Sequence, residues 1–170
     1  IRERIAPMLE TLQAKGIYLQ MPIGAEFGFK GVVDLLSMKA FVYDGDSGRY
    51  NQTDIPAELN ADAAQWREEM IEDVSELDDE LIEKFLDGKE LATDEVKKAV
   101  RDATRERRIF PILFGSPLHQ IGVVQVLDAV ADYLPAPLEE AEFTGKNPVK
   151  GEALKRKHDP NAPFSAYVFK

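Results

Sequence analysis

Hydrophobic residues recur every three or four positions in two parts of the chain, which is the spacing of amphipathic helices. The first part predicts a helix over residues 1–14, ended by the basic residue Lys15 and the helix-stopping residue Gly16. The second part starts at Pro56 and keeps the helical spacing from Leu59 to Phe85. The chain therefore begins with one short helix and carries a much longer helical region further on.

The long helical region fits one continuous helix, but a break near Asp78 is favoured. Leu77 and Ile82 are placed to form a hydrophobic staple around an Asp N-cap. Gly88 then closes the region, and Thr93 with two following acidic residues starts another helix that ends in the basic segment 105–108.

Between the two helical parts, the pattern changes to that of strands. Residues 18–23 form the first candidate strand, and Pro22 favours an edge or a strand end. Residues 32–36 and 38–43 follow, and the turn residues 44–48 predict a hairpin that returns through Arg49 and Tyr50. We expect a small sheet before the long helices.

A second strand, loop and helix lie near residue 115. The apolar run 109–113 is short enough for a buried strand, and the loop with Gly115 and Ser116 leads to a helix over 123–133 that stops before Pro135. A strand, a tight loop and a helix form the ligand-binding edge of many α/β proteins. Beyond this helix, residues 138–162 show little periodicity and predict a surface linker, and residues 163–170 alternate like a strand.

Composition narrows the classes of function. The 170 residues include no cysteine, so the chain has neither disulfides nor thiolate metal ligands. No apolar run is long enough to span a membrane, and a net charge of −10 argues against direct binding of nucleic acid. The first residue is neither a start methionine nor part of a signal peptide, so we expect the chain to be a piece of a larger protein.

The negative charge is concentrated in residues 57–87, which hold twelve acidic residues against two basic ones. These acids are either the solvated side of amphipathic helices or a docking face for a basic partner. Like charges on one helix repel, at a cost of about 0.2–0.5 kcal/mol for each pair, and a docking role would explain that cost. The candidate partner-binding residues are Glu68, Glu69, Glu72, Asp73 and Glu76.

The sequence offers little catalytic chemistry. The glycine-rich segment 24–31 lacks the Gly-Lys-Ser/Thr of a phosphate-binding loop, because Lys30 is followed by Gly31. His119 and His158 are the only histidines and have no set of partners, so we interpret both as ordinary loop residues. No catalytic residue and no metal ligand is predicted.

Several segments, in order, resemble one family. The sequence GSPLHQIGVVQVLDAVADYLPAP (115–137) resembles the fifth guanine-nucleotide motif of translation elongation factor G and the helix that follows it. LQMPIGAEFGFKGVVDLLSMKA (19–40) and DDELIEKFLDGKELATDEVKKAVR (78–101) are similar to the subdomain inserted in that factor's GTPase domain. APFSAYVFK (162–170) is similar to the first strand of the β-barrel domain that comes next.

The resemblance implies an α/β (α+β) fold, a fragment of a P-loop GTPase domain with its inserted helix-and-sheet subdomain and the start of a β-barrel. The implied divisions are a helix of the GTPase domain (1–14), the inserted subdomain (15–108), the last strand and helix of the GTPase domain (109–137), a linker (138–162) and a first barrel strand (163–170).

The resemblance also implies a function. Elongation factor G is a cytoplasmic GTPase that drives translocation on the ribosome, and its inserted subdomain contacts the C-terminal domain of the ribosomal stalk protein. The parent would use GTP or GDP with magnesium. The fragment, which lacks the phosphate, magnesium and switch motifs, would hold no cofactor and be inactive alone. The loop facing the guanine base would be Gly115, Ser116, Pro117 and Leu118.

Two departures from the family pattern lie in this loop. Pro117 stands where the family has alanine, and residues 119–121 replace a more usual Lys-Asn-Lys type of segment. They leave open an alternative, a non-catalytic ribosome-interaction module of a paralogue in which guanine-nucleotide binding is lost or altered.

Overall fold

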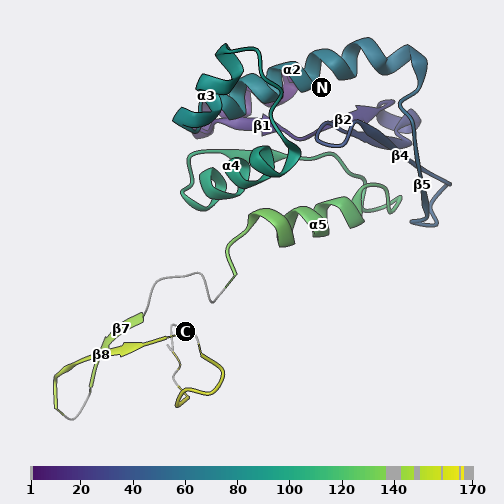
Figure 1. The fold of residues 1–170 in the computed structure, drawn as a ribbon. Coiled ribbons are helices and arrows are strands. Elements are labelled where there is room, and N and C mark those ends of the chain that lie inside the picture. Colours follow the sequence, from purple (N-terminus) through teal and green to yellow (C-terminus); the bar gives the residue numbers. More distant parts are fainter. Residues whose placement is uncertain (1, 137–142, 148–149, 158, 165, 167–170) are drawn as a thin grey trace. The chain divides into compact units, whose positions relative to one another are not determined.

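A computed structural model describes the chain except residues 1, 137–142, 148–149, 158, 165 and 167–170, and its two compact units are Ile1–Leu134 and Pro135–Lys170 (Figure 1). The predicted mixture of helices and sheet is confirmed. The first unit contains α1 (Arg2–Leu12), β1 (Gly16–Tyr18), β2 (Gln20–Ile23), η1 (Glu26–Gly28), β3 (Gly31–Asp34), β4 (Lys39–Tyr43), β5 (Tyr50–Thr53), η2 (Ala57–Leu59), α2 (Asn60–Ser75), α3 (Asp79–Leu86), α4 (Thr93–Arg105), β6 (Phe110–Ile112) and α5 (Val123–Tyr133).

Strands β2 to β5 form an antiparallel sheet in chain order, with β2 at one edge. Pro22 lies in β2, as its missing N–H requires of an edge strand. The predicted hairpin joins β4 and β5. Gly31 lets β3 approach β4 closely, because a Cβ there would lie 2.2 Å from the carbonyl oxygen of Phe41.

Strands β1 and β6 form a separate parallel pair, in which Gly16 to Tyr18 lie beside Phe110 to Ile112. The single strand predicted over 18–23 is wrong, because Leu19 divides it. The Leu19 amide donates to the Ile112 carbonyl at 3.1 Å, and the Leu19 carbonyl accepts from the Leu35 amide at 3.0 Å. Leu19 thus connects the two sheets through its backbone hydrogen bonds. Because β1 and β6 are paired, the segment between them starts and ends at neighbouring strands.

The expected burial of the strand near residue 110 is only partly correct. Ile109 is fully buried, but Phe110 is 49% exposed and the other residues of β6 are half-buried. Within the described residues, β6 pairs with β1 alone, so its other side lacks a neighbouring strand.

The observed helices agree closely with those predicted from the sequence. The favoured break at Asp78 is confirmed, because its carboxylate caps α3 by accepting from the amides of Glu80 at 2.9 Å and Leu81 at 3.4 Å. Helix α4 starts at Thr93, where the Glu95 side chain accepts from the amide of Ala92 at 3.1 Å. No helix in the described residues is long and apolar enough to cross a membrane.

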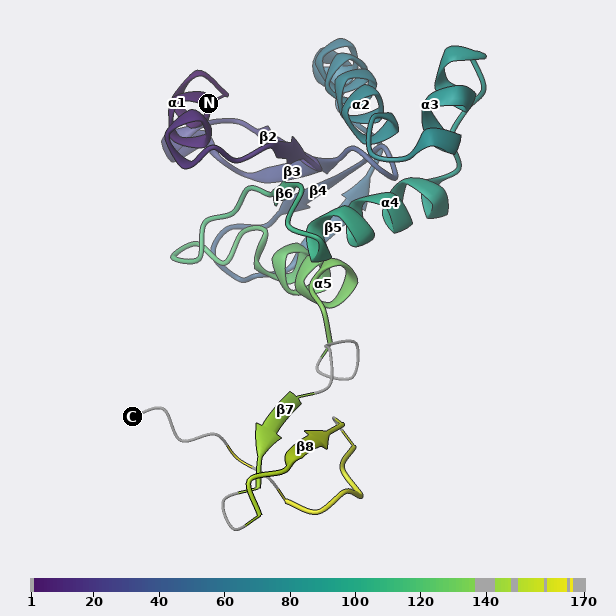
Figure 2. The ribbon, with the colours of Figure 1, turned by 90° about the vertical axis from the view of Figure 1, so that its left-hand side faces the viewer.

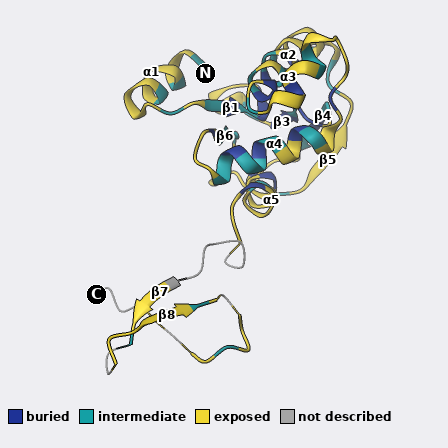
Figure 3. Ribbon diagram, turned by 60° about the vertical axis from the view of Figure 1, so that its left-hand side comes forward, coloured by how far each residue is buried: buried dark blue, intermediate teal, exposed yellow. Residues whose placement is uncertain are grey.

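The core of the first unit lies between the sheet and helices α2 and α4, which also contact each other (Figures 1 and 3). Its largest fully buried side chains include Ile17, Leu35, Met70, Val74 and Val100. Arg67 of α2 reaches over this core and donates to the carbonyl oxygens of Leu35 and, at 2.8 Å, Leu36. That contact fixes the turn between β3 and β4 against α2.

Helix α1 (Figure 2) has the predicted position in the sequence but no buried residue (Figure 3). The guanidinium of Arg2 lies 3.6 Å from the centre of the Trp66 ring and 4.9 Å from that of Tyr18, and it pairs with Glu69. Leu9 packs over Gly16, where a Cβ would lie 2.8 Å from the leucine methyl. The side chains of Arg2 and Leu9 therefore hold α1 against the rest of the first unit.

We expect Arg2→Ala to loosen α1 without unfolding the first unit. The change removes the stacking on Trp66, worth about 0.5–2 kcal/mol, together with the ion pair to Glu69. Hydrogen exchange should show faster exchange of the α1 amides and unchanged exchange in α4. Arg2→Lys should give an intermediate result, because an ammonium lacks the planar stacking of a guanidinium.

Lowering the pH should loosen α1, as Arg2→Ala does. The hydrogen bond from Arg2 lowers the pKa of Glu69 below its usual value. The stabilisation of α1 by this ion pair is therefore complete at pH values above the usual pKa, and it is lost as the pH falls through the lowered pKa. Exchange in α1 that did not respond to Arg2→Ala would contradict this account of how α1 is held.

The second unit contains a hairpin of β7 (Phe143–Lys146) and β8 (Ala153–Arg156), which pair antiparallel. The linker predicted over 138–162 is therefore wrong for these residues. Neither strand sequence, FTGK or ALKR, alternates apolar and polar residues, so the sequence pattern did not indicate the hairpin. The barrel strand predicted over 163–170 lies largely outside the described residues.

Candidate functional site

The loop after β6 is closed by its own backbone. The Ser116 amide donates to the Ile121 carbonyl at 2.8 Å, and the Ile121 amide donates back at 3.0 Å. Inside this bridge, the Gln120 amide donates to the Pro117 carbonyl at 3.1 Å. The loop therefore presents residues 117–119 at the end of a closed turn.

Two contacts hold this loop against β1 and β2. The Phe114 amide donates to the side-chain oxygen of Gln20, which is 3% exposed, and the Phe114 ring stacks on Tyr18 with centroids 6.2 Å apart. Gly122 has a φ of 74°, and a Cβ there would lie 2.5 Å from the Phe114 carbonyl oxygen. Only glycine combines this left-handed conformation with such close approach, and α5 starts at the next residue.

The hairpin between β4 and β5 reaches the same loop. His119 Nδ1 lies 2.9 Å from Asp46 Oδ1, and a Cβ on Gly48 would lie 2.8 Å from the side-chain oxygen of Gln120. Both the hairpin and the loop were predicted from the sequence, but His119 was interpreted as an ordinary loop residue. Its pairing with Asp46 joins residues far apart in the sequence, and no local pattern indicates it.

Pro117 has no N–H to offer to a ligand. The next residue, Leu118, is 83% exposed, and its amide makes no hydrogen bond within the described residues. A free amide therefore follows the proline directly. Of the predicted loop residues, Gly115 and Ser116 form the closed base of the turn, and Pro117 and Leu118 lie at its tip.

The five acidic candidates, four on α2 and Glu76 at its C-cap, fall into two groups. Glu69 pairs with Arg2, and Lys15 Nζ lies 2.7 Å from Glu76 and 3.6 Å from Asp73. The hydrogen bond from Lys15 lowers the pKa of Glu76, and that same bond raises the pKa of Lys15. These three acids are already used to hold the chain's own basic residues.

Glu68 and Glu72 form the other group. Both are exposed, and neither has an ion pair or side-chain hydrogen bond within the part of the chain that the structure describes. Residues 69, 73 and 76, three of the five predicted partner-binding residues, are thus paired with Arg2 or Lys15. Among the residues that the structure describes, Glu68 and Glu72 are the two of the five candidates without an ion pair.

Comparison with known proteins shows which proteins this chain is similar to. No protein-family model matches the chain. The chain is, however, 44% identical over 167 residues to "Elongation factor G" of Thermotoga sp. (strain RQ2), and 43% identical over the same length to "Elongation factor G" of Thermotoga maritima. Each match covers 98% of this chain. The chain is homologous to part of elongation factor G.

The homologous part is about a quarter of the factor, since each match covers 24% of the relative's length. A solved crystal structure, that of the protein ttk003000868 from Thermus thermophilus, has a similar fold, with a TM-score of 0.70 at 22% sequence identity. The likeness covers 91% of this chain and 24% of that one. The predicted resemblance to elongation factor G is confirmed.

Proposed function

We propose that this chain is a non-catalytic part of an elongation factor G-like ribosomal GTPase that acts in translocation during protein synthesis in the cytoplasm. The identity of 44% to elongation factor G over 98% of the chain carries the proposal. In the whole parent, GTP or GDP with magnesium would be the cofactor. The loop of Gly115, Ser116, Pro117 and Leu118 would contribute only to the contact with the base.

Two features of the fold support this assignment. The adjacent parallel strands β1 and β6 are the arrangement expected where residues between them form an insertion in another domain. Helix α5 exposes a row of apolar side chains that a longer protein would cover. This row consists of Val123, Val126, Leu127, Val130 and Leu134.

Ribosome-stimulated GTP hydrolysis tests the proposal directly. The full-length parent should hydrolyse GTP much faster when ribosomes are added, and the 170-residue chain should not hydrolyse it under either condition. A full-length parent that ignores both GTP and ribosomes would contradict the proposal.

The alternative is a non-catalytic ribosome-interaction module of a paralogue with lost or altered nucleotide binding. Pro117 favours it, because the family contact expected from this position needs an N–H. Such a protein would bind the ribosome or its stalk equally well with and without GTP.

The acidic face gives a prediction about the ribosomal stalk protein, whose C-terminal domain is the proposed partner. Replacing both Glu68 and Glu72 with Gln should weaken its binding about three- to tenfold, mainly by slowing association, and added salt should reduce the difference. Chemical shifts of the labelled stalk domain, followed during titration at two salt concentrations, would measure it.

The chain offers a matched control for this experiment. Replacing Asp73 and Glu76 with Gln removes the same charge but acts on residues already paired with Lys15. This control should weaken stalk binding less than the first pair does. If both pairs weaken stalk binding equally, the effect comes from the net charge of the chain and not from a docking site. If replacing Glu68 and Glu72 has no effect on stalk binding, these residues are only the solvated side of the helix.

Pro117 gives a prediction about guanine recognition. Pro117→Ala in the full-length parent restores an N–H for the exocyclic oxygen of guanine and should tighten GDP about ten- to one-hundred-fold. Affinity for inosine diphosphate, which keeps that oxygen, should tighten to the same extent. If GDP affinity does not change, the free Leu118 amide or a water molecule already makes the contact.

A further inference from the structure

The turn between β4 and β5 contacts the loop of residues 115–121 through side chains. His119 Nδ1 lies 2.9 Å from Asp46 Oδ1, across 73 positions of the sequence. A Cβ on Gly48 would lie 2.8 Å from Gln120 Oε1 and 3.5 Å from Gln120 Cβ, so the turn passes directly beside this side chain. Two consecutive residues of the loop are therefore in contact with one turn of the sheet.

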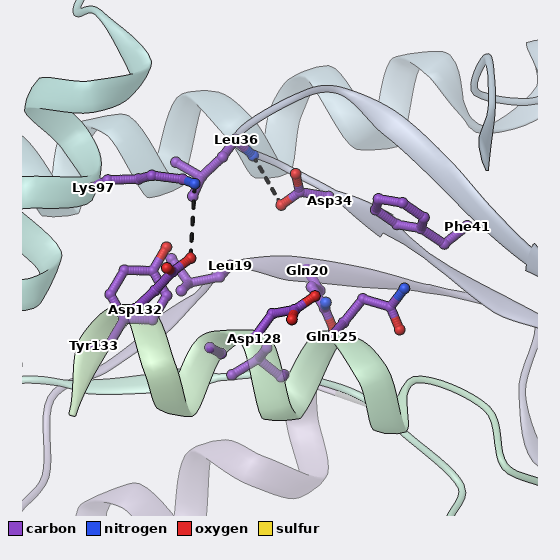
Figure 4. A pocket seen from close by; sticks show the side chains of 12 residues that line it. Leu19, Gln20, Asp34, Leu36, Phe41, Lys97, Gln125, Asp128, Asp132 and Tyr133 are labelled. Atoms are coloured by element: carbon purple, nitrogen blue, oxygen red, sulfur yellow. Dashed lines mark hydrogen bonds and ion pairs between the residues drawn. The ribbon is translucent and has the colours of Figure 1, made fainter. Parts of the chain in front are cut away.

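A buried contact joins the same hairpin to the helix that follows the loop. Tyr43, the last residue of β4, is 6% exposed, and its hydroxyl donates to the side-chain oxygen of Gln125, which is 8% exposed. Gln125 lies in the first turn of α5 and, with Phe41 of β4, lines the cavity shown in Figure 4. The hairpin thus contacts the chain both within the loop and directly after it.

The turn has a shape that is defined by its own hydrogen bonds. The Asp44 amide donates to the Arg49 carbonyl at 3.1 Å. The Ser47 hydroxyl donates to the Asp44 carbonyl at 2.8 Å and accepts from the Arg49 amide at 3.2 Å. Asp46 therefore reaches His119 from an ordered support.

The loop depends on contacts of this kind for its position. Within the described residues, the backbone hydrogen bonds of residues 115–121 join these residues only to one another. They fix the shape of the loop but not its place relative to the sheet. The contacts of Phe114 hold the start of the loop, and those of the hairpin hold its far side, directly after the exposed tip residues Pro117 and Leu118.

We propose that Asp46 is a positioning residue for the guanine contact and that it acts through His119. The carboxylate holds the imidazole, and the imidazole keeps the two preceding residues, Pro117 and Leu118, in one place for the base. This inference rests on the proposed function, because the guanine contact of the loop is part of that proposal. It adds a residue of the β4–β5 hairpin to those on which guanine affinity depends.

Competition with a fluorescent GDP, measured on the full-length parent, tests the inference. Asp46→Ala should weaken GDP about three- to fivefold, the effect of losing one exposed charged contact. Asp46→Asn keeps an acceptor oxygen for His119 and should restore most of the affinity. 2-Aminopurine riboside diphosphate, which lacks the exocyclic oxygen of guanine, should bind the parent and Asp46→Ala equally well. A role in fold stability alone would not distinguish the two nucleotides.

Asp44→Ala is the matched control, because it removes the same charge from the same turn. The Asp44 side chain is exposed and has no ion pair or hydrogen bond within the part of the chain that the structure describes. This control should leave the GDP affinity unchanged. His119→Ala should weaken GDP as much as Asp46→Ala does, and the double variant should weaken it no further.

The outcomes separate this inference from the proposed function. If the parent binds GDP but Asp46→Ala has no effect, the inference is overturned and the proposed function stands. Equal weakening by Asp44→Ala and Asp46→Ala, or additive losses in the double variant, would overturn it in the same way. A parent that binds no GDP would contradict the proposed function itself, and the inference with it.

Discussion

Gly122→Ala should lower the free energy of unfolding of the first unit by about 2–5 kcal/mol. Alanine at a φ of 74° costs about 1–2 kcal/mol, and its Cβ would lie 2.5 Å from the Phe114 carbonyl oxygen, which adds overpacking of about 1–3 kcal/mol. The new methyl group would push the start of α5 away from the loop of residues 115–121. Urea unfolding, followed by the fluorescence of the single tryptophan, Trp66, measures the change.

Gly88→Ala separates the two parts of this effect. Gly88 has a similar φ of 69°, but a Cβ there would meet nothing within 4 Å. We expect a loss of about 1–2 kcal/mol from backbone strain alone. If Gly122→Ala destabilises the unit no more than Gly88→Ala does, the close approach of Gly122 to Phe114 is not what holds the loop.

Elements with local signals could be predicted from the sequence. The break at Asp78 has a capping residue, and α5 has a clear start at Gly122 and a stop before Pro135. The division at Leu19 could not be predicted, because it depends on hydrogen bonds to Ile112 and Leu35. The hairpin of β7 and β8 could not be predicted either, because neither FTGK nor ALKR alternates apolar and polar residues.

The candidate site shows the same limit. Its loop could be located because Gly115 and Ser116 stand between a strand and a helix pattern. Its long-range partners could not, since neither the contact of His119 with Asp46 nor that of Lys15 with Glu76 leaves a pattern in the sequence.

The largest functional effect is expected from the 170-residue chain itself, which should show no measurable affinity for GTP and no hydrolysis. Most of the binding and catalysis in such GTPases comes from contacts with phosphate and magnesium. The loop at Ser116 would offer contacts to the base alone. Calorimetry of the chain and of the full-length parent, side by side, measures the difference, and micromolar binding of GTP by the chain would contradict this expectation.

We propose that the loop of Gly115, Ser116, Pro117 and Leu118 contacts guanine in the full-length parent, and this is the central claim. Hydrogen exchange of that parent, measured with GDP, with ADP and without nucleotide, tests it most directly. We predict that GDP slows exchange in residues 115–121, including the Leu118 amide that is unbonded here, and that ADP does not. Exchange in this loop that stays the same while GDP is bound elsewhere in the protein would contradict the account.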